Sequence, residues 1–193
     1  MKICVYGAAS SLIDKSYTDA GKELGRKMAK RGHGLVFGGG NNGMMGAVAR
    51  GVAEENGEIL GIIPKFFEEA EAEISFTGCT EYIYTDTMGQ RKELLEDKSN
   101  AFIIAPGGIG TFDEFFQALT LKQLGRHNKP MVVFNINGFF DELATALYKM
   151  VKENFITSDC VELCKVSSDI DEILDYIESY DQESIDISKV KIR

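Results

Sequence analysis

Residues 101–116 read AFIIAPGGIGTFDEFF, and this stretch decides the fold. It begins with an apolar run of strand length, residues 101–105, passes through a glycine-rich turn, residues 106–111, and continues with apolar residues at helical spacing. Such a turn lets backbone N–H groups approach an anion closely, and the helix N-terminus adds partial positive charge. Glycine also simply forms tight corners, so one turn alone is weak support for an anion site.

The same alternation of strand and helix continues along the whole chain. The apolar runs are rich in Val, Ile and Phe with little polar alternation, as expected of strands covered on both faces. The candidate strands are residues 2–7, 34–37, 58–63, 81–85, 101–105, 131–135 and 161–166. The segments between them have helical periodicity, including a long helix from Phe140 to Val151 and a last one from Ile170 to Ile177. This order predicts an α/β fold with a doubly wound, Rossmann-like parallel sheet.

We expect a single domain over residues 1–180, followed by a polar tail, residues 181–193. A chain of 193 residues has the size of one domain, and 44% hydrophobic with 26% charged residues is ordinary for a globular protein. No repeat, low-complexity segment or long linker divides it. No apolar run approaches the roughly 20 residues that a membrane span needs, so we expect no membrane insertion.

Charge and cysteine content narrow the function classes. The net charge of −9 argues against a duplex nucleic-acid binder, but it leaves room for a small anionic ligand held by local donors. The four cysteines occur without a secretory signal, which predicts a reduced, cytoplasmic protein. Cys160 and Cys164 have a spacing that suggests a metal, but His33 and His127 are far away in sequence. We therefore expect idle thiols and no metal site.

Three turns at strand ends are expected at one edge of the sheet. Residues 7–11 (GAASS), 38–46 (GGGNNGMMG) and 106–111 (PGGIGT) each follow a candidate strand. Ligands of open α/β sheets bind beyond the carboxyl ends of the strands, which is where these turns lie. No Gly-Lys-Ser/Thr follows, so neither glycine-rich turn is a Walker A loop, and the first turn lacks Gly-x-Gly-x-x-Gly. A mononucleotide is therefore favoured over a dinucleotide.

Glu114 and Asp113 lie in the first turn of the helix after the third turn. Both complement the helix dipole, and we assign Asp113 that role. A carboxylate beside a phosphate-binding turn is electrostatically unfavourable unless it acts on the ligand, so we interpret Glu114 as catalytic or ligand-binding. The stripe expected to pack on the sheet consists of Phe112, Phe115, Phe116 and Leu119, with Glu114, Ala118 and Leu121 roughly opposite.

Two apolar faces on one helix require two covering surfaces, which suggests a partner subunit over this helix. A second candidate pair is Arg91-Lys92, near the start of a helix that begins close to Thr87. Cations at a helix N-terminus oppose the dipole, so this placement suits an anionic ligand. The alternative is a solvated surface pair.

The motifs TMGQRK at residues 87–92 and PGGIGTFDE at residues 106–114 together closely resemble the signature of the LOG ("Lonely guy") family. Members are cytokinin riboside 5′-monophosphate phosphoribohydrolases, often mislabelled lysine decarboxylases. The likeness covers roughly residues 2–180, with further matches at 38–46, 61–64, 123–125 and 129–130. The sequence departs from the pattern at Gly89, where a His is usual, and in residues 66–73, which leaves base specificity open.

The resemblance implies a Rossmann-like homodimer that works without metal or organic cofactor. It would hydrolyse the N-glycosidic bond of AMP or an N6-modified AMP, releasing the free base and ribose 5-phosphate. The catalytic Arg and Glu of the family correspond to Arg91 and Glu114. Its substrate contacts correspond to Lys92, Gly108, Ile109, Gly110, Thr111 and Thr120, with a further acidic contact at Glu73. Gly39, Gly40, Gly43 and Gly107 of the turns and Met88 of the first motif complete the expected substrate site.

Two other functions use the same turns. A non-catalytic carrier of a nucleotide or of a molybdopterin-type cofactor, or a nucleotide sensor, needs the anion site but no reactive carboxylate. The presence of both Arg91 and Glu114 favours the enzyme. A lysine decarboxylase would need pyridoxal phosphate and a Schiff-base lysine, for which no motif argues.

Overall fold

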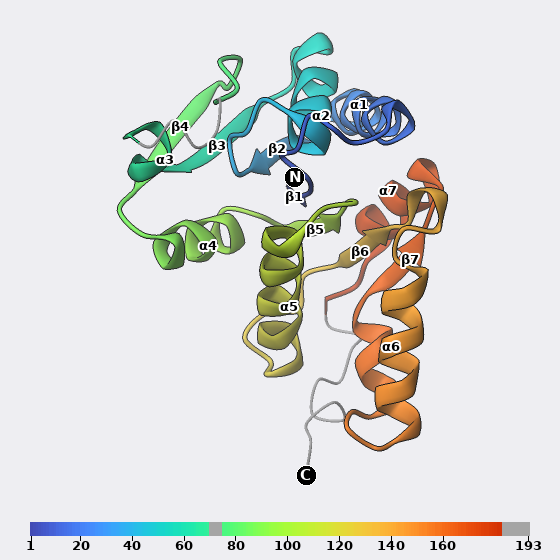
Figure 1. Cartoon of the computed structure of the whole chain (residues 1–193). Coiled ribbons are helices and arrows are strands. Elements are labelled where there is room, and N and C mark those ends of the chain that lie inside the picture. Colours follow the sequence, from blue (N-terminus) through green and yellow to red (C-terminus); the bar gives the residue numbers. More distant parts are fainter. Residues whose placement is uncertain (70–74, 183–193) are drawn as a thin grey trace.

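The computed structural model describes residues 1–69 and 75–182. Within these residues the chain forms one seven-stranded sheet in which every strand is parallel to its neighbours (Figure 1). The strands are β1 (Lys2–Tyr6), β2 (Gly34–Phe37), β3 (Ile59–Pro64), β4 (Glu81–Thr85), β5 (Ala101–Ile104), β6 (Met131–Phe134) and β7 (Lys165–Ser167). The helices are α1 (Lys15–Lys30), α2 (Gly43–Glu54), α3 (Lys65–Glu69), α4 (Met88–Asp97), α5 (Ile109–Gln123), α6 (Asp141–Lys152) and α7 (Ile170–Ser179), with 3-10 turns η1 (Ile136–Gly138) and η2 (Ser158–Leu163). The predicted doubly wound α/β fold is confirmed.

The strand order, β4-β3-β2-β1-β5-β6-β7, defines where a ligand is expected. The chain builds outward from β1 to β4 and then returns, so that β5 pairs with the other side of β1. In this pair Ile3 lies opposite Ala101 and Tyr6 opposite Ile104. The connections therefore reverse direction between β1 and β5, and such a switch point opens a crevice at the carboxyl ends of the strands.

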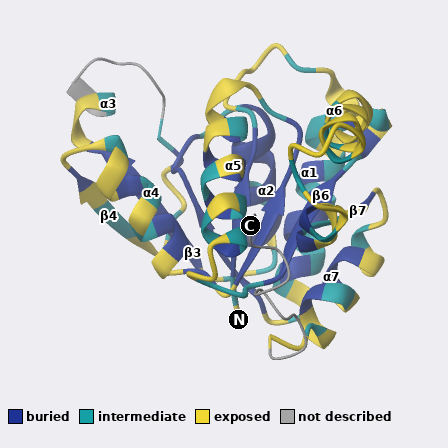
Figure 2. Ribbon diagram, turned by 90° about the horizontal axis from the view of Figure 1, so that it is seen from below, coloured by how far each residue is buried: buried dark blue, intermediate teal, exposed yellow. Residues whose placement is uncertain are grey.

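Side chains that alternate along each strand enter two separate cores. On β1, Ile3 and Val5 belong to the core under α1, α2 and α7, whereas Cys4 and Tyr6 belong to the core under α4, α5 and α6. Figure 2 shows the buried strands in the middle of the molecule and the exposed outer faces of the helices. Burial on both faces explains why the strands are continuous apolar runs.

Close packing of α1 on α2 positions the second glycine turn. A Cβ at Gly25 of α1 would lie 2.1 Å from the Val48 carbonyl oxygen, and one at Gly51 of α2 would lie 2.0 Å from the Lys22 carbonyl oxygen. The two backbones therefore approach each other to a distance that only glycine permits. Because α2 begins at Gly43, this packing also sets the place of the turn in front of it.

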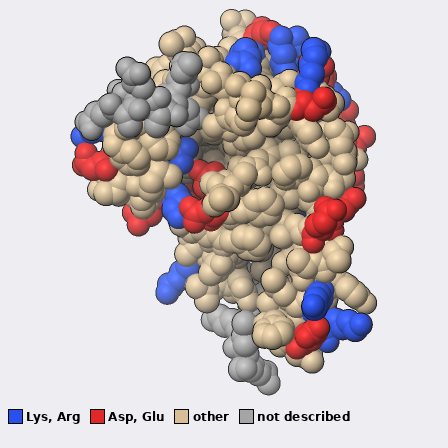
Figure 3. Space-filling view, in the orientation of Figure 1, with Lys and Arg blue, Asp and Glu red and all other residues tan. Residues whose placement is uncertain are grey.

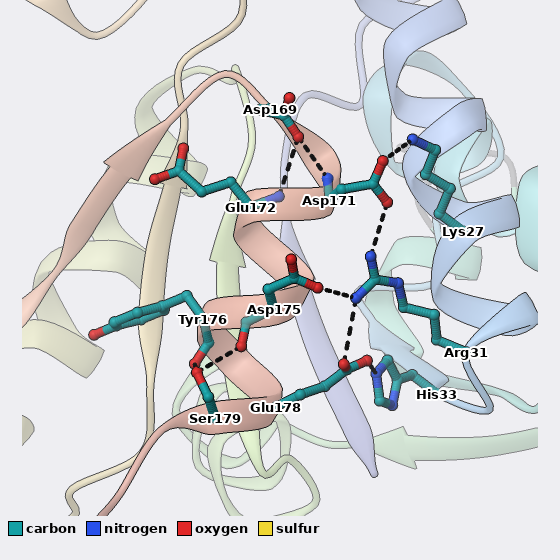
Figure 4. Close-up of polar contacts among 10 residues, drawn as sticks. All are labelled: Lys27, Arg31, His33, Asp169, Asp171, Glu172, Asp175, Tyr176, Glu178 and Ser179. Carbon is teal, nitrogen blue, oxygen red and sulfur yellow. Dashed lines mark hydrogen bonds and ion pairs between the residues drawn. The ribbon is translucent and has the colours of Figure 1, made fainter.

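The last described helix, α7, is joined to α1 by an ion-pair network (Figure 4). Asp171 lies 2.6 Å from the Lys27 amine and 2.8 Å from the Arg31 guanidinium. Three residues after the end of α1 in the sequence, His33 also contacts α7: its Nε2 lies 2.8 Å from a Glu178 carboxylate oxygen. Single exposed ion pairs contribute little, but this network shares one arginine among several carboxylates. It ties the end of the described chain to its first helix.

The predicted start of the last strand was wrong, although the strand itself exists as β7. Residues 158–163 form η2, and β7 begins only at Lys165. The apolar residues Cys160 and Leu163 point inward three positions apart, which matches the period of a 3-10 turn rather than the two-residue period of a strand. At the other strands the predicted ends agree to within one residue, and Pro64 proves to be the last residue of β3 instead of following it.

Two further expectations from the sequence concern the polar C-terminal tail and membrane insertion. The described part of the predicted tail ends at Gln182, and residues 183–193 lie outside the described residues. No helix among the described residues is both long and apolar enough to cross a bilayer.

Candidate active site

The three predicted turns meet at the carboxyl edge of the sheet. The Ala8 N–H donates to the Pro106 carbonyl at 3.0 Å, which joins the first turn to the third. The Met45 N–H donates to the Ala8 carbonyl at 3.1 Å, which joins the second turn to the first. Gly43 has a φ of 58°, and a Cβ there would lie 2.5 Å from the Ala8 carbonyl oxygen. This junction therefore requires glycine at position 43.

Two helices begin at these turns without a side-chain cap. Gly108, the N-cap residue of α5, has no side chain that could cap the helix. Asn42, the N-cap residue of α2, makes no side-chain hydrogen bond to the helix N-terminus. By contrast, the Thr87 hydroxyl caps α4 by accepting from the Gln90 N–H at 3.2 Å. Uncapped N–H groups with the positive end of the helix dipole suit an anion. A Cβ at Gly108 or Gly110 would meet no atom within 4 Å, so this backbone faces open space.

A buried ion pair lies beside the turns. Arg91 on α4 donates from Nη1 to Glu114 Oε1 on α5 at 3.0 Å, and the two residues are only 5% and 8% exposed. The Arg91 Nε–H donates to the Ile62 carbonyl at the end of β3, 3.2 Å away. The alternative of a solvated Arg91 is therefore excluded.

Burial makes Glu114 an unusual carboxyl group. Desolvation raises the pKa of Glu114 to about 7, although the Arg91 charge acts in the opposite direction, and Asp113 raises it further. The side chain thus changes protonation near neutral pH. A carboxyl group with a pKa shifted in this way, next to a glycine turn at a helix N-terminus, is typical of an active site.

A second, outer ion pair spans the same two helices. The Lys92 amine lies 2.9 Å from the Asp113 carboxylate, whose side chain is half-exposed. Figure 3 shows basic and acidic side chains side by side over the gap between α4 and α5. Asp113, interpreted from sequence as a dipole partner, is therefore the counterion of Lys92, the predicted substrate contact.

The predicted faces of α5 were wrong. The buried residues of this helix include Glu114, Phe115 and Ala118, so Glu114 lies on the inner side together with part of the stripe assigned to the sheet. Phe116 of that stripe is exposed. The reason is that Arg91 reaches Glu114 from α4 and lets a carboxylate occupy a position that periodicity reserves for apolar residues.

The remaining predicted substrate contacts, Met88, Thr120 and Glu73, do not all lie beside the Arg91–Glu114 pair among the described residues. Met88 is half-buried at the first position of α4, close to Arg91 in the chain. Thr120 follows Glu114 by six residues, roughly one and two-thirds turns of helix, and is exposed on another side of α5. Glu73 lies outside the described residues. The described residues include no cluster of three or more His, Cys, Asp or Glu side chains that could hold a metal ion.

Two neighbours of Arg91 were not identified from sequence. A Cβ at Gly38 would lie 1.9 Å from Arg91 Nη2, so this glycine makes room for the guanidinium. The Phe67 ring of α3 has its centroid 5.8 Å from the guanidinium carbon. Gly38 stands in a conspicuous run of three glycines, but no local pattern marks Phe67 as a neighbour of Arg91.

The fold and site define a Rossmann-like α/β protein with a buried Arg–Glu pair at the switch point of its sheet. A protein-family model described as "Possible lysine decarboxylase" matches residues 45–177, more than half of the chain. The chain belongs to this family, the LOG family, as the two motifs predicted.

Two curated relatives agree with this assignment. The chain is 37% identical to the cytokinin riboside 5′-monophosphate phosphoribohydrolase LOG2 of Arabidopsis thaliana over 179 residues, which cover 93% of this chain and 83% of that protein. It is 35% identical to LOG3 of the same plant, covering 93% and 82%.

Among solved structures, the molybdenum cofactor binding protein of Rippkaea orientalis matches with a TM-score of 0.70 and 21% identity, covering 92% of this chain and 95% of that one. The molybdenum cofactor carrier protein of Chlamydomonas reinhardtii matches with a TM-score of 0.68 and 22% identity, with the same coverage. At this identity the two structures show a shared fold alone.

Proposed function

We propose that this protein is a nucleoside 5′-monophosphate phosphoribohydrolase, which releases the free base and ribose 5-phosphate from AMP or an N6-modified AMP. The observation that carries the proposal is the buried Arg91–Glu114 pair, which lies next to two uncapped glycine turns. The names of the relatives at 35–37% identity support the same reaction.

The glycine turns are the proposed site of the 5′-phosphate. At the third turn the substrate contacts would be the backbone N–H groups of residues 107–111, and at the second turn those of Gly39, Gly40 and Gly43. Binding energy from the phosphate fixes the ribose and is used at the reacting carbon. Nucleosides without the phosphate are therefore expected to be poor substrates.

Glu114 is proposed to act on the ribose. Cleavage of an N-ribosyl bond develops positive charge on the sugar, as in glycoside hydrolysis. An ionised Glu114 stabilises that charge or accepts a bond from a ribose hydroxyl, while water adds to the anomeric carbon. The base leaves with the bonding electrons and takes up a proton. A buried carboxylate does this better than an exposed one, because its field is less screened.

Arg91 is proposed to have two tasks. Its Nη1 holds Glu114, and its charge favours the ionised carboxylate. Among the described residues, its Nη2 has no hydrogen-bond partner. These two N–H groups are available to an oxygen of the substrate.

The family description names a lysine decarboxylase, which we do not favour. Schiff-base chemistry needs a lysine at the cofactor site. The fully buried Lys122 lies in the last turn of α5, at the opposite end of the helix from the glycine turn, and donates to the Lys129 carbonyl and the Tyr180 hydroxyl. Lys92 is paired with Asp113.

A homodimer is proposed from the outer face of α5 and from α6. Ile109 is 91% exposed and Phe116 is also exposed, and no residue of α6 is buried although the helix is amphipathic. Between α5 and α6 lies an apolar cavity of about 310 Å³, lined in part by Leu143 and Met150. Apolar surface of this extent on a small protein indicates a covered face, and a second copy of the chain is the proposed cover. Thr120 lines a second hollow on the same face.

The test is base release from a panel of nucleoside 5′-monophosphates and the matching nucleosides, comparing the wild type with Glu114→Gln. We expect release from AMP or its N6-modified forms, little from the nucleosides, and a loss of about a hundredfold or more in the variant. Equal turnover of adenosine and AMP would contradict the role of the phosphate turns. Tight nucleotide binding without turnover by the folded wild type would instead favour the carrier or sensor.

A further inference from the structure

Phe67 lies over the guanidinium of Arg91, with 5.8 Å between its ring centroid and the guanidinium carbon. It belongs to α3, the five-residue helix that directly follows β3. The same strand supplies the Ile62 carbonyl that accepts from Arg91 Nε. The guanidinium is therefore contacted by a backbone oxygen of β3 and by an aromatic ring of α3, the helix that directly follows it.

The position of Phe67 is itself supported by neighbouring residues. The Lys65 amine at the start of α3 lies 2.7 Å from the Asp86 carboxylate, just before α4 begins. Phe66 contacts the Phe67 ring edge to face, with 5.0 Å between the centroids. The two residues that precede Phe67 thus support its ring, and one of them joins the start of α3 to the residue just before α4.

Arg91 needs such a contact because its hydrogen bonds leave part of its charge unbalanced. Glu114 receives one bond from Nη1, and the pKa of Glu114 lies near 7, so the carboxyl is not fully ionised at neutral pH. When Glu114 is protonated, the buried Arg91 has no other ion-pair partner among the described residues. An aromatic face attracts such a cation through its quadrupole, more strongly where water is excluded.

We propose that Phe67 is a positioning residue for the reaction, whose ring face holds the Arg91 guanidinium in the orientation that serves Glu114 and the substrate. The proposal rests on the proposed function, and it adds an aromatic third member to the Arg–Glu pair. Phe67 acts through Arg91, so its removal affects the chemical step more than substrate binding.

The experiment compares Phe67→Leu, which keeps most of the volume but removes the π-face, with Phe67→Tyr, which keeps the face. Phe155→Leu is the control, since it makes the same change in the exposed turn after α6, and Phe155 has no ring contact with Phe67 or Arg91 among the described residues. Turnover of the best nucleoside 5′-monophosphate is measured, with melting temperatures recorded for all four proteins.

We expect Phe67→Leu to lower kcat by about two- to thirtyfold, the range of a partly or fully buried cation–π contact, with KM changed less than twofold. Phe67→Tyr should retain kcat within about twofold, and so should Phe155→Leu. A normal kcat in Phe67→Leu, or an equal loss in Phe155→Leu, would overturn the proposal.

A measurement without turnover separates this proposal from the proposed function. The Arg91 side-chain Nε–H signal in a ¹⁵N spectrum, assigned by its loss in Arg91→Lys, senses the ring current of Phe67. A shift of this signal in Phe67→Leu and not in Phe155→Leu supports the contact even if the wild type releases no base. An unchanged signal in Phe67→Leu overturns the proposal even if the enzyme is active.

Discussion

At the residue level, the proposed chemistry depends on a glutamate and an arginine 23 positions apart in sequence, which form a buried hydrogen bond. Glutamate and arginine are common residues, so the residue types alone do not identify an active site. Burial raises the pKa of Glu114 to about 7, and the Arg91 charge keeps it from rising further. A group with this pKa is half ionised near neutral pH, where a small change in its surroundings changes its charge.

The pH dependence of kcat/KM follows from this pKa. If the ionised carboxylate is the active form, kcat/KM should rise tenfold per pH unit below about 7 and level off above it. The linked effect on stability has the opposite sign. The folded protein holds the Glu114 proton above the ordinary glutamate pKa, so this group lowers the free energy of unfolding as pH rises from about 4.5 to 7.

The measurement is a pH profile of base release between about pH 3.5 and 9, with melting curves at each pH. An acid limb near pH 4.5 would mean that Glu114 is not the titrating group. Asp113→Asn offers a check, because Asp113 raises the pKa of Glu114, and the limb should move to lower pH in that variant.

At the scale of elements, the site depends on how closely α1 packs on α2. A Cβ at Gly25 would overlap the Val48 carbonyl, so Gly25→Ala should force the helices apart. We expect a loss of about 1–3 kcal/mol in the free energy of unfolding, as in other overpacked interiors. Because α2 begins at the second glycine turn, substrate affinity should fall as well.

Urea unfolding of Gly25→Ala checks this expectation, with Gly89→Ala as the control for stability. Gly89 lies in the exposed first turn of α4, where a Cβ would meet only the Thr87 hydroxyl at 3.7 Å. Alanine there should be neutral or stabilising by up to about 1 kcal/mol. A Gly25→Ala protein as stable as the wild type would mean that the two helices adjust without cost.

At the scale of the whole molecule, the exposed apolar surface of α5 and α6 predicts self-association. Replacing Phe116 by Glu places a charge in that surface and should shift the protein from dimer to monomer, because burying an unpaired charge is costly. Sedimentation at micromolar concentration measures this. Tyr148→Glu is the control, since Tyr148 is exposed on α6 but does not line the cavity. A monomeric wild type would contradict the prediction.

The amino-acid sequence alone was sufficient to predict the sheet, the three turns and the two residues, Arg91 and Glu114, that form the buried ion pair. These features are local: a strand buried on both faces is a continuous apolar run, and a glycine turn before a helix is visible in a few residues. Residues 101–116 contain one strand, one turn and the start of one helix, and the structure has all three. The paired motifs around Arg91 and Glu114 were likewise sufficient to indicate the family.

Only the tertiary structure decided which side of α5 carries Glu114, where β7 begins, and what surrounds Arg91. The periodicity of α5 indicates an apolar face, but it carries no information about α4. Arg91 on α4 pairs with Glu114 and thereby makes burial of this carboxylate tolerable. Gly38 and Phe67 approach Arg91 from two other segments of the chain. Contacts between distant segments depend on the packing of complete elements. The same packing buries Glu114, and this burial raises its pKa to about 7.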